Sequence, residues 1–416
     1  MRTWPAPNIP ALPVAANLAP VRVFDSATGT LVEAAPGSIA TLYACGITPY
    51  DATHLGHANT YLAFDLLQRA WLDAGKQVTY ASNITDVDDP LLERAAATGV
   101  DWRELAREQT ELFRADMTAL RMLPPNAWVS VVAIIPDVVA AVAGMLARGE
   151  AYWVDGDVYA DLSADPWFGT VAGLAASDPA TLALFGERGG DPERPGKRHP
   201  LDPALWRAER PGDPSWEGGQ LGRGRPGWHI ECAVIARDAL GLPFDIQGGG
   251  TDLRFPHHEM SSSHARLIGG GAARTHMHAG LVAYQGEKMS KSRGNLVFVS
   301  RLLADGVDPM AIRLALLFHH YREEWEWTDA DLARGVECLA VWRQGVAEAH
   351  RATGLDGGVA DRVVAGVRAA LADDLNAPRA LSLVDEWAAL QSCAPGGPAA
   401  AQAVAEAIDA LLGIRL

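Results

Sequence analysis

The stretch Cys45-Gly-Ile-Thr-Pro-Tyr-Asp-Ala-Thr-His-Leu-Gly-His-Ala-Asn-Thr60 lies between an apolar run and a helical pattern. Residues 39–44 are typical of a buried strand, and the apolar residues between 62 and 71 fall on one helical face. A strand, a polar turn with glycines and a helix form the arrangement in which a helix N-terminus meets a phosphate group. We therefore predict a doubly wound α/β sheet whose first phosphate-facing turn is His54-Leu-Gly-His57.

Length and composition limit the classes of protein that fit this sequence. With 416 residues, the chain is long enough for two or three domains with a large core. No membrane span is expected, because Pro136 and Asp137 interrupt the most apolar window, residues 128–146, which we expect to be a loop entering a buried helix. No export signal is visible, and four scattered cysteines are too few for a disulfide framework. We expect a cytoplasmic protein with no membrane partner.

The charge of the chain argues against a wide nucleic-acid surface. The net charge is −16, with 51 acidic and 35 basic residues, whereas proteins that bind a polyanion over a wide surface usually carry a basic face. Lysine is scarce, since the chain has only Lys76, Lys197, Lys288 and Lys291. Two of these four lie in Lys288-Met-Ser-Lys-Ser292, which indicates a site that needs a compact, flexible ammonium group rather than a planar guanidinium.

Apolar periodicity and turn residues predict a sheet that is interrupted and then resumed. The expected elements in chain order are strand 39–45, helix 56–74, strand 77–83, helices 101–121 and 136–148, a hairpin over 151–160, helix 228–240, strand 243–247, helix 257–268 and strand 276–284. Residues 187–226 are rich in glycine, proline and charge, and are expected to be mostly loop. From about residue 308 onwards we expect almost only helix.

The two motifs, His54-Leu-Gly-His57 and Lys288-Met-Ser-Lys-Ser292, resemble in their order and separation the signatures of class I aminoacyl-tRNA synthetases. Three further stretches resemble the cysteine-specific branch of that class: Asn83-Ile-Thr-Asp-Val-Asp-Asp89, Gly227-Trp-His-Ile-Glu-Cys232 and Phe255-Pro-His-His-Glu259. The resemblance runs from about residue 20 to about residue 330 and is loose in the C-terminal helices. It implies a Rossmann-like doubly wound parallel sheet with an inserted connective segment and a C-terminal helical bundle.

This fold implies a division of the chain into five parts. The expected parts are an N-terminal arm over 1–35, a Rossmann-like catalytic domain over 36–95 and 226–285, an inserted connective segment over 96–225, a region over 286–330 with the lysine motif and a stem-contact segment, and a helical bundle over 331–416.

The resemblance also implies a metal site. Cys45, Cys232 and His257 align with the zinc ligands of cysteinyl-tRNA synthetases, in which the metal takes the substrate thiolate. Their spacing alone does not identify such a site, since isolated cysteines and histidines are more often core or surface residues. Three ligands leave one zinc position open, and zinc prefers a thiolate to a hydroxyl. The synthetases have a fourth ligand, a glutamate, where this chain has Ser261, and Glu259 stands at a different offset. We expect one Zn²⁺ per chain.

The nucleotide site is expected at the two motifs. By resemblance, His54 and His57 contact the phosphates of ATP, which binds with Mg²⁺, while Lys288 and Lys291 hold the departing pyrophosphate. Taken alone, the lysine motif also fits a solvated loop.

The resemblance places the cysteinyl-adenylate among residues near the ends of several strands. They are Gly46, Ile47, Thr48, Thr60, Asn83, Ile84, Thr85, Trp228, Gly250, Thr251, Asp252 and Val282. Some of these residues also fit other roles. Trp228 could be an ordinary aromatic residue of the core, and the glycine run 248–250 could form a turn after the preceding strand. Three acidic residues have more than one possible role: Asp86, Asp88 and Asp89 could bind the cysteine ammonium group, bind magnesium or cap a helix.

The composition of the C-terminal residues helps to indicate which molecule accepts the activated cysteine. From Asp331 onwards there are seven arginines, no lysine and eleven acidic residues, which does not suit an anticodon stem. Together with Ser261 and the stretch Glu187-Arg-Gly-Gly-Asp-Pro192, this region resembles the cysteine ligases of mycothiol biosynthesis. That resemblance implies an ATP-dependent carbon–nitrogen ligase, with no tRNA partner and as a monomer. Its expected substrates are L-cysteine, ATP and glucosaminyl-inositol, and its expected products are the cysteinyl amide, AMP and pyrophosphate.

Two alternatives are a cysteinyl-tRNA synthetase and an inactive synthetase-like binding module. The module is disfavoured because both motifs and all three shared zinc ligands are present. The residues that contact the sugar and inositol rings and the base for amide formation stay open. Glu187, Arg188 and Asp191 fit either an acceptor pocket or a simple Gly-Gly turn.

Overall fold

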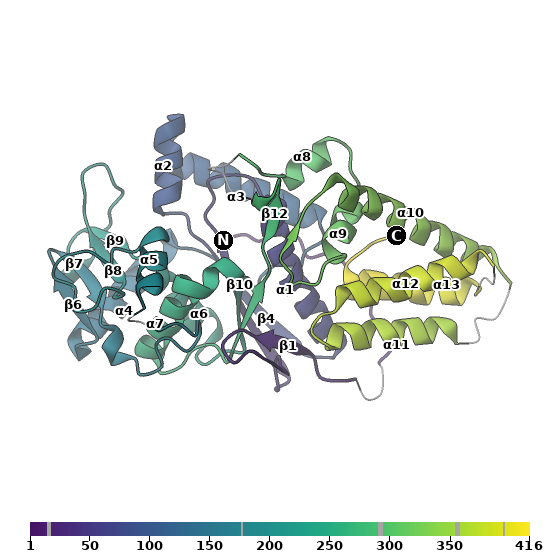
Figure 1. The fold of residues 1–416 in the computed structure, drawn as a ribbon, viewed down its shortest axis with the longest axis horizontal. Helices are drawn as coiled ribbons and strands as arrows, with labels where there is room; N and C mark the ends of the chain where they lie inside the picture. The colour runs from purple at the N-terminus through teal and green to yellow at the C-terminus, as the bar shows by residue number, and fades with distance from the viewer. Residues whose placement is uncertain (15–17, 176–177, 290–293, 354–357, 394–395) are drawn as a thin grey trace.

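The computed structural model describes residues 1–416 except 15–17, 176–177, 290–293, 354–357 and 394–395. Figure 1 shows an elongated molecule in three regions. A small antiparallel sheet with its helices lies at one end, the parallel sheet with helix α1 (Leu55–Asp73) lies in the middle, and a helical bundle forms the other end.

The central sheet has five parallel strands in the order β11-β10-β3-β4-β5. They are β3 (Ile39–Ile47), β4 (Gln77–Ile84), β5 (Ala127–Ser130), β10 (Ile246–Gly250) and β11 (Thr275–Ala279). The chain fills one half of the sheet from β3 to β5 and then the other half with β10 and β11, so the strand order reverses between β3 and β10. In such sheets ligands bind outside the carboxyl ends of the strands at this switch point. The predicted doubly wound α/β fold is confirmed.

Strand β10 differs from its prediction. It was expected over 243–247 with the glycines following it, but it begins at Ile246 and runs through Gly248 to Gly250. The strand extends into the glycines, and at Gly248 helix α1 packs directly against it. A Cβ atom on Gly248 would lie 2.3 Å from the ring of Phe64 on α1.

The predicted strand 276–284 is divided in the structure. Strand β11 ends at Ala279, and β12 (Val282–Tyr284) belongs to a separate sheet with β13 (Glu287–Lys288) and β14 (Trp325–Glu326). The break follows from Gly280, whose N–H donates to the carbonyl of Tyr321 at 2.8 Å. A Cβ atom there would lie 2.0 Å from the carbonyl oxygen of Glu323, so the two segments meet backbone to backbone.

Residues 128–146 were expected to be a loop entering a helix. The helix is confirmed as α4 (Ile135–Arg148), but the range begins within strand β5, which pairs with β4. The N-terminal arm stabilises this edge of the sheet. Trp4 packs edge-on against Trp128, with ring centroids 5.4 Å apart, and donates from its indole nitrogen to the carbonyl of Met122 at 2.9 Å. The arm also contains a hairpin, β1 (Arg22–Asp25) and β2 (Thr30–Glu33).

The segments that connect the strands of the central sheet form helices and an antiparallel sheet. The helices are α2 (Asp89–Thr98), α3 (Trp102–Ala119), α4 (Ile135–Arg148), α5 (Pro179–Glu187), α6 (Trp228–Leu240) and α7 (Glu259–Gly269). The sheet is β6 (Ala151–Val154), β7 (Asp157–Ala160), β8 (Ala204–Ala208) and β9 (Gly224–Pro226). The predicted hairpin over 151–160 is confirmed as β6 and β7, whereas β8 and β9 lie in a range that was expected to be loop.

The C-terminal part is helical as predicted, apart from the short strand β14. Its helices are α8 (Val299–Ala304), α9 (Pro309–Leu317), α10 (Asp329–Arg351), α11 (Val359–Ala372), α12 (Ala377–Gln391) and α13 (Pro398–Ala407). Among the described helices of the whole chain, none is both long enough and apolar enough to cross a membrane.

A buried ionic network joins helix α1, which packs on the central sheet, to this bundle. Asp65 on α1 accepts hydrogen bonds from Arg69 at 2.8 Å and from Arg313 on α9, and all three side chains are almost fully buried. Both arginines also donate to carbonyl groups near the C-terminus, Arg69 to Ala410 at 3.1 Å and Arg313 to Leu412 at 2.6 Å. Burial opposes ionisation of Asp65, but the two guanidinium groups outweigh it and hold the pKa of Asp65 below its usual value.

We predict that Asp65→Ala destabilises the protein by about 3–5 kcal/mol, because it leaves two buried guanidinium groups without their counter-ion. Urea unfolding followed by tryptophan fluorescence measures this loss. Arg301→Ala is the control, since it breaks an exposed ion pair with Asp305 and is expected to cost less than about 1 kcal/mol. Equal losses in the two variants would contradict a structural role for the buried network.

Candidate functional site

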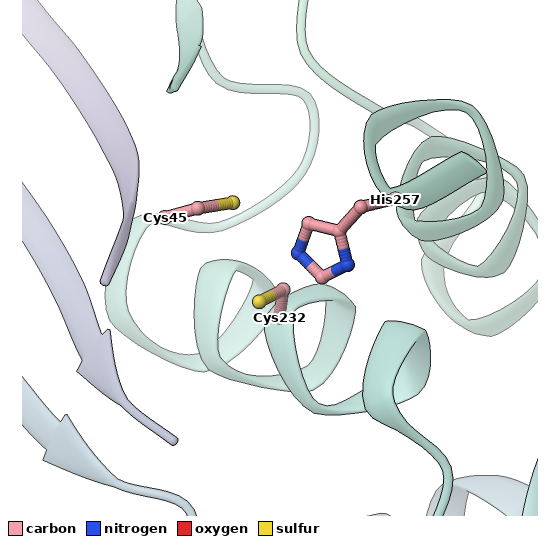
Figure 2. A group of neighbouring side chains, drawn as sticks. All are labelled: Cys45, Cys232 and His257. Atoms are coloured by element: carbon pink, nitrogen blue, oxygen red, sulfur yellow. The ribbon is translucent and has the colours of Figure 1, made fainter. Parts of the chain in front are cut away.

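Three soft donors meet beside the carboxyl end of β3. Cys45 lies near the end of that strand, Cys232 lies on α6, and His257 lies on a short π-helical turn, Arg254–His258, that leads into α7. Figure 2 shows their side chains facing one common space. Their ligand atoms all lie within 4.8 Å of one another, and the three residues are 6%, 1% and 1% exposed. Two thiols and an imidazole form a donor set that suits zinc, so the structure brings the predicted ligands together as a candidate metal site.

The surroundings of Cys232 disfavour the ionised form of its thiol. The neighbouring Cys45 and burial together raise the pKa of the Cys232 thiol well above its usual value. A metal ligand must be a thiolate, and a bound cation supplies the positive charge that makes the thiolate stable. The cluster therefore fits a metal ion bound with release of thiol protons.

The imidazole of His257 is held in place by its neighbours. Its Nδ1 atom lies 3.0 Å from Nδ1 of His229, and the indole of Trp228 stacks on its ring with centroids 4.2 Å apart. Burial lowers the pKa of His229 well below its usual value, so this partner is neutral. A hydrogen bond at Nδ1 leaves Nε2 of His257 for a metal ion. We did not predict His229, although its place three residues before Cys232 puts both on one face of α6.

A second histidine chain approaches the metal site from the other side. Nε2 of His258 lies 3.2 Å from Sγ of Cys45, and Nδ1 of His258 lies 2.8 Å from Nε2 of His278. His278 in turn lies 2.8 Å from the hydroxyl of Ser26. Burial lowers the pKa of His258 well below its usual value, so a neutral imidazole contacts the sulfur. We did not predict this chain, because only the fold brings β11 and the N-terminal hairpin to Cys45.

Neither Ser261 nor Glu259 supplies a fourth ligand. The hydroxyl of Ser261 accepts a hydrogen bond from Nε2 of Gln247 at 2.8 Å and so contacts the sheet. The carboxylate of Glu259 accepts backbone N–H groups of Gly169, Val171 and Ala172 at 2.8–2.9 Å. The donor set of the described residues is thus two cysteines and one histidine, as expected.

The ends of β3 and β4 are joined by one amide side chain. Oδ1 of Asn83 accepts the N–H of Gly46 at 2.7 Å and the hydroxyl of Tyr43 at 3.0 Å, and Nδ2 donates to Thr85 at 2.9 Å. The N–H of Thr85 donates to the carbonyl of Ile47 at 3.0 Å. A Cβ atom on Gly46 would lie 1.5 Å from the carbonyl oxygen of Asn83, so only glycine allows this approach. Ile84 is buried beside these groups.

Helix α1 begins at the predicted phosphate-facing turn. His54 is its N-cap, and the rings of His54 and His57 are stacked with centroids 3.8 Å apart. A Cβ atom on Gly56 would lie 2.9 Å from the His54 ring, and Thr60 donates to the carbonyl of Gly56 at 3.1 Å. N–H groups at a helix N-terminus and two imidazoles suit an anion such as a phosphate.

The segment after the lysine motif lies against this turn. The N–H of Leu55 donates to Val297 at 2.9 Å, and the N–H of Val299 donates to Thr53 at 3.0 Å. The backbone of Lys288 belongs to β13, whereas Lys291 lies outside the described residues. The fold therefore brings the surroundings of both motifs together, and the roles of the two lysines stay predictions.

The end of β10 forms the corner where a ribose is expected. A Cβ atom on Gly250 would lie 2.6 Å from a carboxylate oxygen of Asp252. Oγ1 of Thr251 is buried and has no hydrogen-bond partner among the described residues, which fits a hydroxyl left for a ligand. Val282 begins β12 and is 2% exposed.

All three aspartates of the acidic stretch have structural partners, and Asp89 pairs with Arg207 at 2.8 Å and with Arg225. Asp88 caps α2 by accepting the N–H of Asp89 at 2.9 Å, so helix capping is confirmed for this residue. Asp86 accepts hydrogen bonds from the Ser130 hydroxyl and from the N–H of Val132 at 3.1 Å.

Comparison with known proteins agrees with this geometry. Residues 32–337 match the family described as tRNA synthetases class I (C) catalytic domain. A protein of Xylanimonas cellulosilytica named L-cysteine:1D-myo-inositol 2-amino-2-deoxy-alpha-D-glucopyranoside ligase is 70% identical over the whole length of both chains. A protein of Streptomyces griseus with the same name is 57% identical, also over the whole length of both chains.

Solved structures show the same fold at low sequence identity. The methionyl-tRNA synthetase of Mycobacterium tuberculosis in complex with methionyl-adenylate has a TM-score of 0.62 at 15% identity, over 90% of this chain and 89% of that chain. LeuRS of Agrobacterium radiobacter, solved in a ternary complex with tRNA and LeuAMS, has a TM-score of 0.63 at 12% identity, over 91% of this chain and 84% of that chain. These likenesses concern the fold alone.

We predict that Gly46→Ala lowers the stability by about 1–3 kcal/mol, because its methyl group must displace the backbone of Asn83. Gly37→Ala, just before β3, is the matched control, since the nearest atom to its Cβ lies 3.6 Å away and its cost should stay within about 0.5 kcal/mol. Thermal unfolding by circular dichroism measures both. The same melting temperature for the two variants would show that the strand ends tolerate a side chain.

Proposed function

The chain belongs to the family of L-cysteine:1D-myo-inositol 2-amino-2-deoxy-alpha-D-glucopyranoside ligases, which have a class I tRNA synthetase catalytic domain, and we propose that it activates L-cysteine with ATP and transfers it to the amine of glucosaminyl-inositol. The enzyme is an ATP-dependent ligase. The products are the cysteinyl amide, AMP and pyrophosphate, as the sequence resemblance implies for mycothiol biosynthesis.

One observation carries this proposal. The Cys45, Cys232 and His257 donors lie at the same edge of the sheet as the N-terminus of α1. A cysteine held there by its sulfur has its carboxylate near the phosphates of an ATP bound at His54 and His57. The N–H groups of α1 and the two imidazoles then stabilise negative charge as the carboxylate attacks the α-phosphorus and pyrophosphate leaves. Lys288, Lys291 and Mg²⁺ are proposed to neutralise that leaving group.

The choice of cysteine is proposed to lie in the metal site. Zinc, when bound, supplies a Lewis acid that stabilises the substrate thiolate, which a serine hydroxyl does not match. Cys45, Cys232 and His257 would hold it, while His229 fixes the orientation of His257. Asn83 keeps Gly46 and Thr85 in place around the cysteinyl group, and Gly250 and Thr251 face the nucleoside.

The amino sugar is favoured over tRNA as the acceptor. The ligases match this chain from end to end, including the bundle over 331–416 with its acidic excess. A cysteinyl-tRNA synthetase, our alternative, shares the activation chemistry but needs a surface for an RNA stem. Location in the cytoplasm, action as a monomer and the absence of a tRNA partner stay predictions.

The test is AMP release from ATP and L-cysteine with either glucosaminyl-inositol or cysteine tRNA as acceptor. We expect release to be stimulated by the amino sugar alone, with a cysteinyl amide detected by mass spectrometry. Stimulation by tRNA alone would establish the synthetase. No cysteine-dependent AMP with either acceptor would support the inactive module.

We predict one zinc ion per chain and its loss in Cys45→Ala. Removal of one thiolate should reduce metal content and slow cysteine-dependent pyrophosphate exchange by about 100-fold or more, since the substrate sulfur loses its partner. Metal analysis and the exchange assay measure these effects, and ATP binding is measured separately. Cys393→Ala, at an exposed cysteine, is the matched control and should change nothing. Equal losses of cysteine activation and ATP binding would contradict a metal-held thiol.

A further inference from the structure

A cavity of about 390 Å³ opens beside the proposed cysteinyl-adenylate site. Thr48 and Trp228, which the resemblance assigns to that site, form part of its wall. The cavity continues outwards between the start of α2, strand β8 and the stretch 185–191 at the end of α5. Its volume falls within the range of cavities that bind small molecules. The nucleotide and the cysteine do not account for most of this space, because Thr48 and Trp228 are the only lining residues among their proposed contacts.

The outer wall of the cavity is held in a defined shape. Arg188 donates to the carbonyl groups of Asp252 and of Phe255, the latter at 2.7 Å, and so ties this stretch to the end of β10. Gly190 lies on the ring of Phe185, where a Cβ atom would come within 2.5 Å of the ring, and Gly189 has a φ of +87°. The two glycines are therefore required by the turn, and the turn places Phe185 and Asp191 in the wall.

Four carboxylates line the cavity, and two of them form ion pairs with cationic side chains. Asp89 pairs with Arg207 at 2.8 Å and with Arg225, and Asp191 pairs with Lys197 at 3.0 Å. Asp88 instead accepts the backbone N–H of Asp89 at 2.9 Å. A carboxylate has about four acceptor positions, so Asp88 keeps capacity for a ligand that donates hydrogen bonds.

We propose that this cavity is the acceptor subsite, in which the amino sugar lies between Trp228 and the 185–191 stretch with its amine at the carboxylate of Asp88. The inference rests on the proposed function and extends it to a site for the second substrate. Trp228 and Tyr50 provide apolar surface for the sugar and cyclitol rings, while the carboxylates accept their hydroxyl groups. Glu93, exposed at the rim, would take a hydroxyl of the outer ring.

The position of Asp88 suits the transfer step. The lone pair of the neutral amine attacks the carbonyl carbon of the cysteinyl-adenylate and forms the C–N bond. The bond between that carbon and the phosphate oxygen breaks, and AMP leaves with the electron pair. The nitrogen then carries an excess proton, which passes to the carboxylate of Asp88 and from there to water. No further reactant is needed.

The surroundings of Asp88 suit a base that works near neutral pH. Burial raises the pKa of Asp88 to about 6, and the titratable and charged groups facing it are Asp89, Arg207, Arg225, Glu231 and Tyr50. Above that pH the carboxylate is ionised and can accept a proton, whereas below it Asp88 is already protonated. Transfer is therefore expected to slow as the pH falls through about 6.

The test separates the two half-reactions in Asp88→Asn. Asparagine is as good an N-cap as aspartate, so α2 should keep its start while the base is lost. We expect cysteine-dependent pyrophosphate exchange to be unchanged within about twofold and single-turnover transfer to glucosaminyl-inositol at pH 7 to fall about 100-fold. Glu93→Gln should raise the KM for the amino sugar alone.

Asp101→Asn, at the N-cap of the neighbouring helix α3, is the matched control and should leave both half-reactions unchanged. Equal transfer by wild-type protein and Asp88→Asn would overturn the subsite, and so would an equal loss of exchange and transfer, which would place Asp88 in cysteine activation. If wild-type protein forms the adenylate but does not use the amino sugar, the proposed function fails and the subsite fails with it.

Discussion

The buried carboxylate of Asp65 is the interaction on which the arrangement of the molecule depends. Its two oxygens serve Arg69, Arg313 and the backbone N–H of Leu123, so α1, α9 and the chain entering β5 meet at one point. Because α1 is one rigid helix, fixing its middle also fixes its N-terminal turn with His54. The same arginines bind carbonyl groups near the C-terminus, which ties the helical bundle to the helix whose N-terminus is proposed to face the phosphates.

Close backbone approach at the carboxyl ends of the strands shapes the site itself. Gly46 leaves no space for a Cβ atom against Asn83, and Gly248 leaves none against α1. These contacts bring Cys45 to the edge where α6 and the turn before α7 present Cys232 and His257. Burial there disfavours thiolates that have no counter-charge. A bound cation would supply that charge and leave a position for the substrate sulfur, so both suit the same space.

Much of the fold was predictable because local periodicity determined it. Helix α1 and the hairpin β6–β7 followed from apolar spacing and an Asp-Gly turn. The predictions were wrong where packing overrides local preference. The glycines of β10 extend a strand that packs against Phe64 at Gly248, and the residues around Trp128 form a strand because β4 and Trp4 cover them. Phe64, β4 and Trp4 are all distant in sequence from the residues that they contact.

The sequence by itself determined the chemistry of this protein, since its two motifs and the identities of Cys45, Cys232 and His257 are side-chain properties that a family resemblance carries. Only the tertiary structure decided how those groups are supported and what lies next to them. The neutral imidazoles of His229 and His258, and the cavity beside Asp88, arise where segments distant in sequence meet. Burial, hydrogen-bond partners and cavities belong to the packed arrangement of several segments, and no single stretch of sequence encodes them.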